Sequence, residues 1–259
     1  MVDRGLVSTR EKARRLILAG QVRVNGATTT KAGAPCADSD QLDLKQPPRY
    51  VSRGGDKMES FHKISKFPIQ DFVFMDVGAS TGGFTDYLLQ NGAARIYAVD
   101  VGTNQLAYSL RQNQKVVCLE KTHIKSLQPI QIPEPIDGFV CDVSFISLDR
   151  VIPLLKKFGK TPHFFVLLVK PQFEVQKEQV GKGGVVRHRS DILQALLKIA
   201  SVLYEEDYGI EGVEFSRVAG PKGNVEFFFW ASSDSSSKLA EPEFEKKIIE
   251  KEVFFSQKS

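Results

Sequence analysis

A glycine-rich turn between an apolar run and an amphipathic run constrains the fold of this chain more than any other feature. The apolar run covers residues 72–75, the turn reads Asp-Val-Gly-Ala-Ser-Thr-Gly-Gly-Phe-Thr over residues 76–85, and the amphipathic run continues to residue 90. Runs of these lengths and periods predict a strand, a tight turn and a helix. A second apolar run, over residues 96–99, ends in Asp100 and predicts the next strand of the same sheet.

This pattern predicts a nucleoside-cofactor site at the ends of the two strands. Small residues in the turn let a ligand approach the backbone, and the carboxylate of Asp100 falls where a ribose diol would bind. The glycine spacing is D-x-G-x-x-x-G-G rather than G-x-G-x-x-G, which favours S-adenosylmethionine over NAD. An ordinary tight turn without ligand is the alternative, and the position of Asp100 argues against it. The predicted cofactor-binding residues are Asp76, Gly78, Ala79, Ser80, Thr81, Gly82, Gly83, Phe84, Thr85, Asp100, Val101, Gly102 and Asp142.

From residue 70 onward strand and helix patterns alternate, which predicts a parallel sheet with crossover helices. The predicted strands are 72–76, 95–99, 116–119, 137–141 and 163–169, the predicted helices are 83–91, 103–112, 147–158 and 190–205, and the closing antiparallel pair is 210–218 and 224–231. The predicted fold class is α/β, a Rossmann-like class I S-adenosylmethionine-dependent methyltransferase with an antiparallel final strand, preceded by a small α+β domain.

The first 35 residues form a basic module on an otherwise nearly neutral chain. They hold seven Lys or Arg residues against two Asp or Glu, whereas the whole chain carries a net charge of +4. Ser8 is the predicted cap of a helix that ends at Gly20, and Asn25-Gly26 predicts a hairpin turn with a return strand over 28–30. A basic module predicts a polyanionic partner such as RNA. The predicted contacts are Arg4, Arg10, Lys12, Arg14, Arg15, Arg23 and Lys31.

Composition shifts divide the chain. We predict an RNA-binding domain over 1–46, a linker over the proline-bearing stretch 47–59, a methyltransferase domain over 60–232 and a serine-rich, charged tail over 233–259. No apolar stretch approaches the ~20 residues of a membrane-spanning helix, and no signal-peptide pattern is present. The three cysteines are widely spaced, which predicts reduced thiols in the cytoplasm and no metal site.

Four charged residues carry the predicted chemistry: Lys57, Asp142, Lys170 and Glu226. Asp142 and Lys170 follow predicted strands, where open α/β sheets bind ligands. Glu226 interrupts an apolar run, which costs several kcal/mol unless the carboxylate is paired, so we expect it to meet a lysine. Methyl transfer to a ribose 2′-OH requires an aligned base. Lys170 is the predicted base, Lys57 the neighbouring cation, and the carboxylates position the amines; a structural salt-bridge network is the alternative for each residue taken singly.

A second glycine-rich stretch, Gly-Lys-Gly-Gly over residues 181–184, superficially resembles a phosphate loop. No Ser or Thr follows the lysine and no upstream glycine has the required spacing, so it does not predict a nucleoside triphosphatase. Two interpretations stay open: a mobile loop, or a lid that contacts RNA through Lys182, Arg187 and Arg189.

Taken together, these segments resemble the TlyA family of rRNA 2′-O-methyltransferases, whose members are often labelled haemolysins. The matching segments are 8–31, 52–57, 76–85, 141–144, 170–174, 181–184 and 220–226. The resemblance implies an FtsJ-like methyltransferase domain, an RNA-binding domain of the ribosomal protein S-four type, and a Lys-Asp-Lys-Glu tetrad at Lys57, Asp142, Lys170 and Glu226. It implies S-adenosylmethionine as cofactor and a cytidine ribose in ribosomal RNA as substrate, whether as naked RNA, in a subunit or in a whole ribosome.

The chain departs from that family pattern in two places. Fewer residues precede the first matching helix, which predicts an RNA-binding module that is short at its N-terminus. Lys121-Thr122-His123 stands where the family has an Arg-Thr-Asn-type sequence, so the adenine-side contacts do not carry over residue by residue. The competing hypotheses are an RNA-binding protein with decayed catalysis, a membrane-active haemolysin and a small-molecule O-methyltransferase. The sequence makes no prediction of the oligomeric state.

Overall fold

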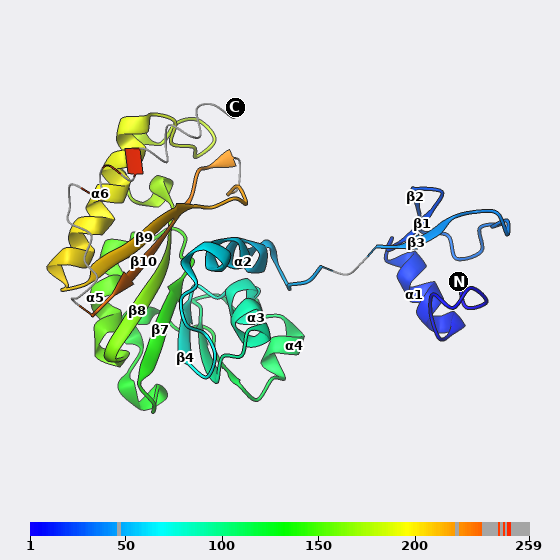
Figure 1. The fold of residues 1–259 in the computed structure, drawn as a ribbon, viewed down its shortest axis with the longest axis horizontal. Coiled ribbons are helices and arrows are strands. Elements are labelled where there is room, and N and C mark those ends of the chain that lie inside the picture. Colours follow the sequence, from blue (N-terminus) through cyan, green and yellow to red (C-terminus); the bar gives the residue numbers. More distant parts are fainter. Residues whose placement is uncertain (46–47, 221–222, 235–242, 244–245, 247, 250–259) are drawn as a thin grey trace. The chain divides into compact units, whose positions relative to one another are not determined.

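A computed structural model describes the chain except for residues 46–47, 221–222, 235–242, 244–245, 247 and 250–259. The chain divides into two compact units, Met1–Arg49 and Tyr50–Ser259 (Figure 1). We refer to them as the N-terminal unit and the sheet unit. Most of the predicted tail over 233–259 lies outside the described residues.

The N-terminal unit is one helix on a small antiparallel sheet. Helix α1 spans Arg10–Leu18, and strands β1 (Val22–Val24), β2 (Ala27–Thr29) and β3 (Leu42–Leu44) pair in the order β2-β1-β3. Asn25 and Gly26 both have positive φ, 50° and 81°, as a type I′ hairpin turn requires, so the predicted hairpin is confirmed.

Two sequence-based predictions for this unit were wrong. The helix cap is Thr9, whose side chain accepts a hydrogen bond from the backbone N–H of Lys12 at 3.2 Å, and not Ser8. Strand β3 lies in the predicted RNA-binding domain, after the predicted return strand, where no further strand was predicted. Its three residues are too few to show the alternation by which strands are recognised, and its pairing with β1 is a tertiary contact.

The sheet unit is built on seven strands in the order β6-β5-β4-β7-β8-β10-β9. Neighbours pair in parallel, except that β10 runs antiparallel to both β8 and β9. The strands are β4 (Val73–Val77), β5 (Arg95–Val99), β6 (Val116–Leu119), β7 (Ile136–Cys141), β8 (Gly159–Val169), β9 (Gly209–Phe215) and β10 (Phe227–Ser232). This confirms the predicted α/β class with an antiparallel final strand. The strand order reverses between β4 and β7, where such sheets open a crevice.

Helices cover both faces of this sheet (Figure 1). They are α2 (Arg53–Ser65), α3 (Gly83–Gln90), α4 (Tyr108–Arg111), α5 (Ile152–Leu155) and α6 (Arg189–Glu205). Short 3₁₀ turns connect them: η1 (Ile124–Ser126), η2 (Pro129–Gln131), η3 (Leu148–Arg150), η4 (Lys156–Phe158), η5 (Pro171–Phe173) and η6 (Lys177–Gln179).

Three predicted segments differ from these helices. Helix α2 begins at Arg53, so the predicted linker over 47–59 is helical in its second half. The helix predicted over 103–112 shrinks to the four residues of α4, because the carboxylate of Glu120 accepts the backbone N–H groups of residues 104–106 and holds them in a loop. The helix predicted over 147–158 is broken into η3, α5 and η4.

Strand residues alternate between two apolar cores. Phe74, Val140 and Phe228 pack with residues of α2 and α3, whereas their strand neighbours, such as Met75 and Phe139, pack with residues of α6 on the other face. Because side chains of a strand point alternately to opposite faces, runs that are apolar throughout are expected for a sheet covered on both sides. The crevice between β4 and β7 therefore rests on strands that are fixed from both faces.

We predict that Phe165→Ala lowers the free energy of unfolding of the sheet unit by ~3–5 kcal/mol, the usual cost of truncating a buried phenylalanine. The Phe165 side chain is fully buried, with ring centroids of Phe139 and Tyr208 at 5.1 and 4.8 Å. Trp230, the single tryptophan of the chain, lies in β10, so its fluorescence during urea titration follows this unit alone. Ile130, 88% exposed, is the control, and Ile130→Ala should change the free energy by less than ~0.5 kcal/mol. Equal destabilisation by the two variants would contradict this packing.

Candidate active site

Two hollows meet at the carboxyl ends of β4 and β7. The wide arm, ≈ 340 Å³, is walled by the loops after β5, β6 and β7. The narrow arm, ≈ 180 Å³, is walled by the turn between β4 and α3, by the start of α2 and by Lys170. Both arms are lined by Gly78, Ser80, Asp142 and Ser144, so together they form one bent cleft at the topological switch point.

Ten of the thirteen residues predicted to bind a cofactor line this cleft. They are Asp76, Gly78, Ala79, Ser80, Thr81, Gly83, Phe84, Asp100, Val101 and Asp142. The other three shape its walls from behind. Gly82 adopts φ 94° with Leu110 in the place of a Cβ, Thr85 binds the Asp76 carboxylate, and the N–H of Gly102 donates to Asp100.

The glycines of the turn are required chiefly for close packing. Gly78 has φ 82°, and a Cβ built on it would lie 2.8 Å from the carbonyl oxygen of Asp142, so the turn and the loop after β7 touch backbone to backbone. A Cβ on Gly83 would lie 2.8 Å from the Cα of Gly54, which lets α3 approach the start of α2. The sequence-based prediction assigned Gly83 to ligand approach alone; its packing against α2 is a second use.

Asp100 links two walls of the wide arm. Its Oδ2 accepts the backbone N–H of Ser80 at 2.8 Å, and its Oδ1 accepts that of Gly102 at 2.7 Å. The carboxylate therefore fixes the turn between β4 and α3 relative to the loop after β5. Thr122 and His123 line the same arm, and His123 Nδ1 accepts the backbone N–H of Lys125 at 3.1 Å.

Asp76 is a buried carboxyl group with one unpaired oxygen. Its Oδ2 accepts hydrogen bonds from the backbone N–H and the hydroxyl of Thr85, at 3.0 and 2.6 Å. Its Oδ1 has no hydrogen-bond partner among the residues that the structure describes. Burial raises the pKa of Asp76 to about 7, the charges of Asp142 and Asp100 add to the rise, and the bonds from Thr85 oppose it.

The four predicted catalytic residues form two ion pairs. Lys57 Nζ lies 2.5 Å from Glu226 Oε2, so Glu226 meets a lysine as its apolar context predicts. Lys170 Nζ lies 2.6 Å from Asp142 Oδ1 and donates to Ser144 Oγ at 3.0 Å. The two lysines are only 7% and 8% exposed. Buried ion pairs of this kind cost desolvation energy that their attraction barely repays.

Sheet register brings the two pairs to one edge. Phe227 of β10 is paired with Val169 of β8, so Glu226, just before β10, and Lys170, just after β8, lie opposite each other at the sheet edge. The sequence predicted Glu226 inside the last strand. The structure instead places it directly before β10. Asp142 follows β7, the neighbour of β8 on the other side.

Sequence reasoning missed several residues that line the cleft, notably Ser144 and Phe145. Phe145 is 92% exposed and adopts φ 64°, a strained backbone conformation for a bulky residue. Its ring centroid lies 5.2 Å from that of Phe173. The signal available in the sequence was the position of Ser144 and Phe145 directly after Asp142, at a predicted strand end.

The predicted RNA-binding residues are exposed in both units. Arg4 also has a structural role. Its guanidinium donates to the backbone carbonyls of residues 37, 38 and 40 and so holds the loop that contains them. Lys182 lies in a loop closed by a bridge between Gly181 and Val185. Asn224 anchors that loop, since its Nδ2 donates to the carbonyl of Gly184 at 2.8 Å.

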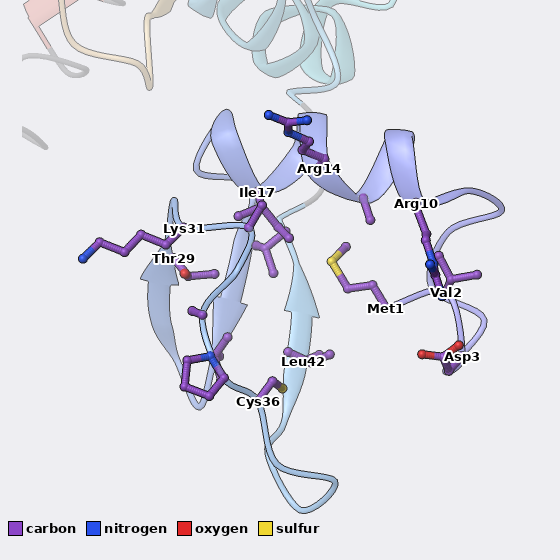
Figure 2. Close-up of a pocket in the computed structure, with 16 residues that line it drawn as sticks. Met1, Val2, Asp3, Arg10, Arg14, Ile17, Thr29, Lys31, Cys36 and Leu42 are labelled. Carbon is purple, nitrogen blue, oxygen red and sulfur yellow. The ribbon is translucent and has the colours of Figure 1, made fainter.

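The N-terminal unit contains a separate cavity of ≈ 400 Å³. Figure 2 shows Met1 of the N-terminal segment, Ile17 of α1 and Leu42 of β3 facing it, with Arg10 and Arg14 on the helix side. Its walls are mainly apolar. The clustered lysines and carboxylates lie in the sheet unit, so we assign the chemistry to the bent cleft.

The described part of the chain contains no helix long and apolar enough to cross a membrane. Within the same residues, no three His, Cys, Asp or Glu side chains gather where they could hold a metal ion. The thiol of Cys141 is buried beneath the cleft, and burial raises its pKa well above the usual value.

Comparison with known proteins assigns each unit to a family. A model of the FtsJ-like methyltransferase family matches residues 50–233, and a model of the S4 domain matches residues 1–42. The first of these matches covers the whole bent cleft and also both ion pairs.

Individual relatives match over nearly the whole chain. YqxC of Bacillus subtilis, named as a candidate rRNA methyltransferase, is 43% identical over 229 residues, which cover 88% of this chain and 82% of that protein. TlyA of Mycobacterium tuberculosis, named 16S/23S rRNA (cytidine-2′-O)-methyltransferase, is 40% identical over 242 residues, 93% and 90% of the two chains. The structure of a candidate hemolysin from Streptococcus thermophilus superposes with a TM-score of 0.76 at 37% identity, covering 97% and 93%. This chain therefore belongs to the FtsJ-like methyltransferase family and, within it, to the TlyA proteins.

Proposed function

We propose that this protein transfers a methyl group from S-adenosylmethionine to a ribose 2′-OH of ribosomal RNA. The observation that carries the proposal is the position of Lys170, which lines the narrow arm and is held by Asp142 and Ser144, two residues that line both arms of the cleft. The printed name of the Mycobacterium tuberculosis relative supports a cytidine as the target. An rRNA substrate also assigns the protein to the cytoplasm.

The cleft fits the two ends of S-adenosylmethionine. The wide arm would take the nucleoside, with its ribose hydroxyls on Asp100. The narrow arm would take the methionine portion, and the unpaired Oδ1 of Asp76 is a buried acceptor suited to its ammonium group. When bound, the cofactor supplies an electrophilic methyl group on a sulfonium.

Lys170 is the proposed base. Its neutral amine would accept the 2′-OH proton as the ribose oxygen takes the methyl group, whose bond to sulfur would break and leave its electron pair on sulfur as a neutral thioether. The resulting ammonium would later lose that proton to solvent. Asp142 and Ser144 fix the direction of Nζ, which supplies the alignment that such a proton transfer needs. Lys57, held by Glu226, would orient the ribose oxygen as a fixed neighbouring cation.

RNA would be held by both units. We assign RNA binding to residues 1–46 and methyl transfer to residues 60–232, with Lys57 of α2 supplied from just before that range. The exposed Phe145 beside the cleft offers a stacking surface to a nucleobase. Exposed basic side chains of α1 and of the loop after η6 offer contacts to phosphates.

We predict that Lys170→Ala lowers the rate of methyl transfer by ~10²–10⁴-fold, the usual contribution of a general base, and leaves the Kd for S-adenosylmethionine nearly unchanged. Transfer of tritium from the labelled cofactor to ribosomal subunits measures the rate, and calorimetry measures the Kd. Lys160→Ala is the matched control, because that lysine pairs with Asp137 at the opposite edge of the sheet. Retained turnover in Lys170→Ala would remove Lys170 from the mechanism.

We predict that cofactor affinity falls as the pH drops below about 7. The pKa of Asp76 is raised to about 7, so below that pH the carboxyl is protonated and must lose its proton to accept an ammonium group. Linkage to Asp76 then weakens binding by up to ~10-fold per pH unit on the acid side. Calorimetry across this range, in buffers of different ionisation enthalpy, measures the affinity and the released proton. A wild-type profile that matches that of Asp76→Asn would contradict this role.

We predict that the double variant Arg15→Ala/Arg23→Ala weakens binding to ribosomal RNA and lowers the slope of log K against log salt by about 2, one for each lost phosphate contact. Both side chains are exposed in the N-terminal unit. Filter binding at several salt concentrations measures both effects. The control is Lys156→Ala/Lys160→Ala, which removes the same charge from the amino edge of the sheet. An equal loss in both double variants would show that the effect is one of net charge alone.

A further inference from the structure

We propose that Glu174 is a positioning residue for methyl transfer. Its carboxylate clamps the far end of the loop after β7, which carries Asp142 and Ser144, to the segment after β8, which carries Lys170. This inference rests on the proposed function, because it explains how the lysine and its two partners stay aligned.

The clamp consists of hydrogen bonds to one buried carboxylate. Glu174 Oε1 accepts the backbone N–H of Leu148 at 3.0 Å, and Oε2 accepts the hydroxyl of Ser147 in a short hydrogen bond. The Glu174 side chain is 2% exposed. Glu174 lies four residues after Lys170, and Ser147 lies three residues after Ser144, so the clamp joins the same two segments that meet at Lys170.

A lysine of α6 completes the cluster. Lys198 Nζ lies 2.7 Å from Asp149 Oδ2 and 3.6 Å from Glu174 Oε2, and it donates to Ser147 Oγ at 2.9 Å. This cation offsets part of the cost of burying Glu174, whose pKa is raised by burial. The clamp therefore rests on a helix that belongs to the core of the sheet unit.

The clamped loop contains backbone strain. Phe145 adopts φ 64°, a conformation that is unfavourable for a bulky non-glycine residue. At its near end the loop is fixed by the hydrogen bond from the N–H of Asp142 to the carbonyl of Val77 at 3.1 Å. At its far end it is fixed by Glu174. Hydrogen bonds to a charged group are stronger than those between neutral groups and hold the loop in this conformation. Loss of the clamp therefore lets the loop relax and moves Ser144 away from Lys170.

The test compares Glu174→Ala with a matched control, Asp137→Ala. Asp137 is also a carboxylate that accepts a backbone N–H, that of Val73 at 2.9 Å, and that pairs with a lysine, but it lies at the start of β7, at the opposite edge. We expect both variants to lower Tm. We expect Glu174→Ala alone to lower the single-turnover rate on ribosomal subunits at saturating S-adenosylmethionine, by ~10–100-fold, since small misplacements of reacting groups have effects of this size.

A conservative variant separates geometry from charge. In Glu174→Gln the amide oxygen can still accept from Leu148, and the amide nitrogen can donate to the Ser147 hydroxyl, so we expect a rate within about threefold of the wild type. Ser147→Ala removes one of the two bonds and should lower the rate by about 3–10-fold. The Kd for the cofactor, measured by calorimetry, should change less than the rate in every variant.

The outcomes are distinct. A folded Glu174→Ala variant as fast as Asp137→Ala overturns the proposal, and so does a Glu174→Gln variant as slow as Glu174→Ala. If Glu174→Ala does not fold, Ser147→Ala decides, because an unchanged rate in that variant also overturns it. A wild-type protein that neither binds S-adenosylmethionine nor labels ribosomal RNA refutes the proposed function instead, and that result is visible before any variant is compared.

Discussion

The backbone contact between the turn after β4 and the loop after β7 is the constraint on which the site depends. A Cβ on Gly78 would lie 2.8 Å from the carbonyl oxygen of Asp142, so the two segments can meet only if this residue is glycine at positive φ. Gly78 and Asp142 line both arms of the bent cleft, so their contact lies where the two arms join. The same contact fixes where the Asp142 carboxylate stands, and through it where Lys170 Nζ is held.

Two walls of the cleft are each held by a carboxylate that does not itself line the cleft. Glu120 accepts three backbone N–H groups and pairs with Arg111, which lowers the pKa of Glu120 to about 2 and sets the loop beside Asp100. Glu174 accepts hydrogen bonds from the Ser147 hydroxyl and the Leu148 N–H and so holds the wall next to Lys170. Loops alone are poor supports for reacting groups, because they lack the packing that fixes helices and strands. At these two walls, hydrogen bonds to the carboxylates of Glu120 and Glu174 take the place of that packing.

The sequence predicted those parts of the fold that local patterns determine. The strand, turn and helix around Asp76 follow from an apolar run, glycines and an amphipathic run, and the long helix α6 follows from its period. The failures have tertiary causes. Residues 104–106 lie in the helix predicted over 103–112, but the carboxylate of Glu120 binds their N–H groups. Strand β3 exists through its pairing with β1. Phe145 could not be predicted, because its positive φ opposes its own local preference.

The four predicted catalytic residues, Lys57, Asp142, Lys170 and Glu226, differ from their surroundings in the sequence because they place charges beside apolar strands. A buried pair such as Lys57 with Glu226 contributes little to stability compared with apolar side chains of similar volume. Two such pairs at the ends of β8 and β10, beside strands that are otherwise apolar, are therefore poorly explained by folding. Charged residues placed against the local pattern are where a functional use is expected. In this chain they lie along the carboxyl edge of the parallel strands, beside the cleft at β4 and β7, and the proposed methyl transfer would give these charges a use that stability does not.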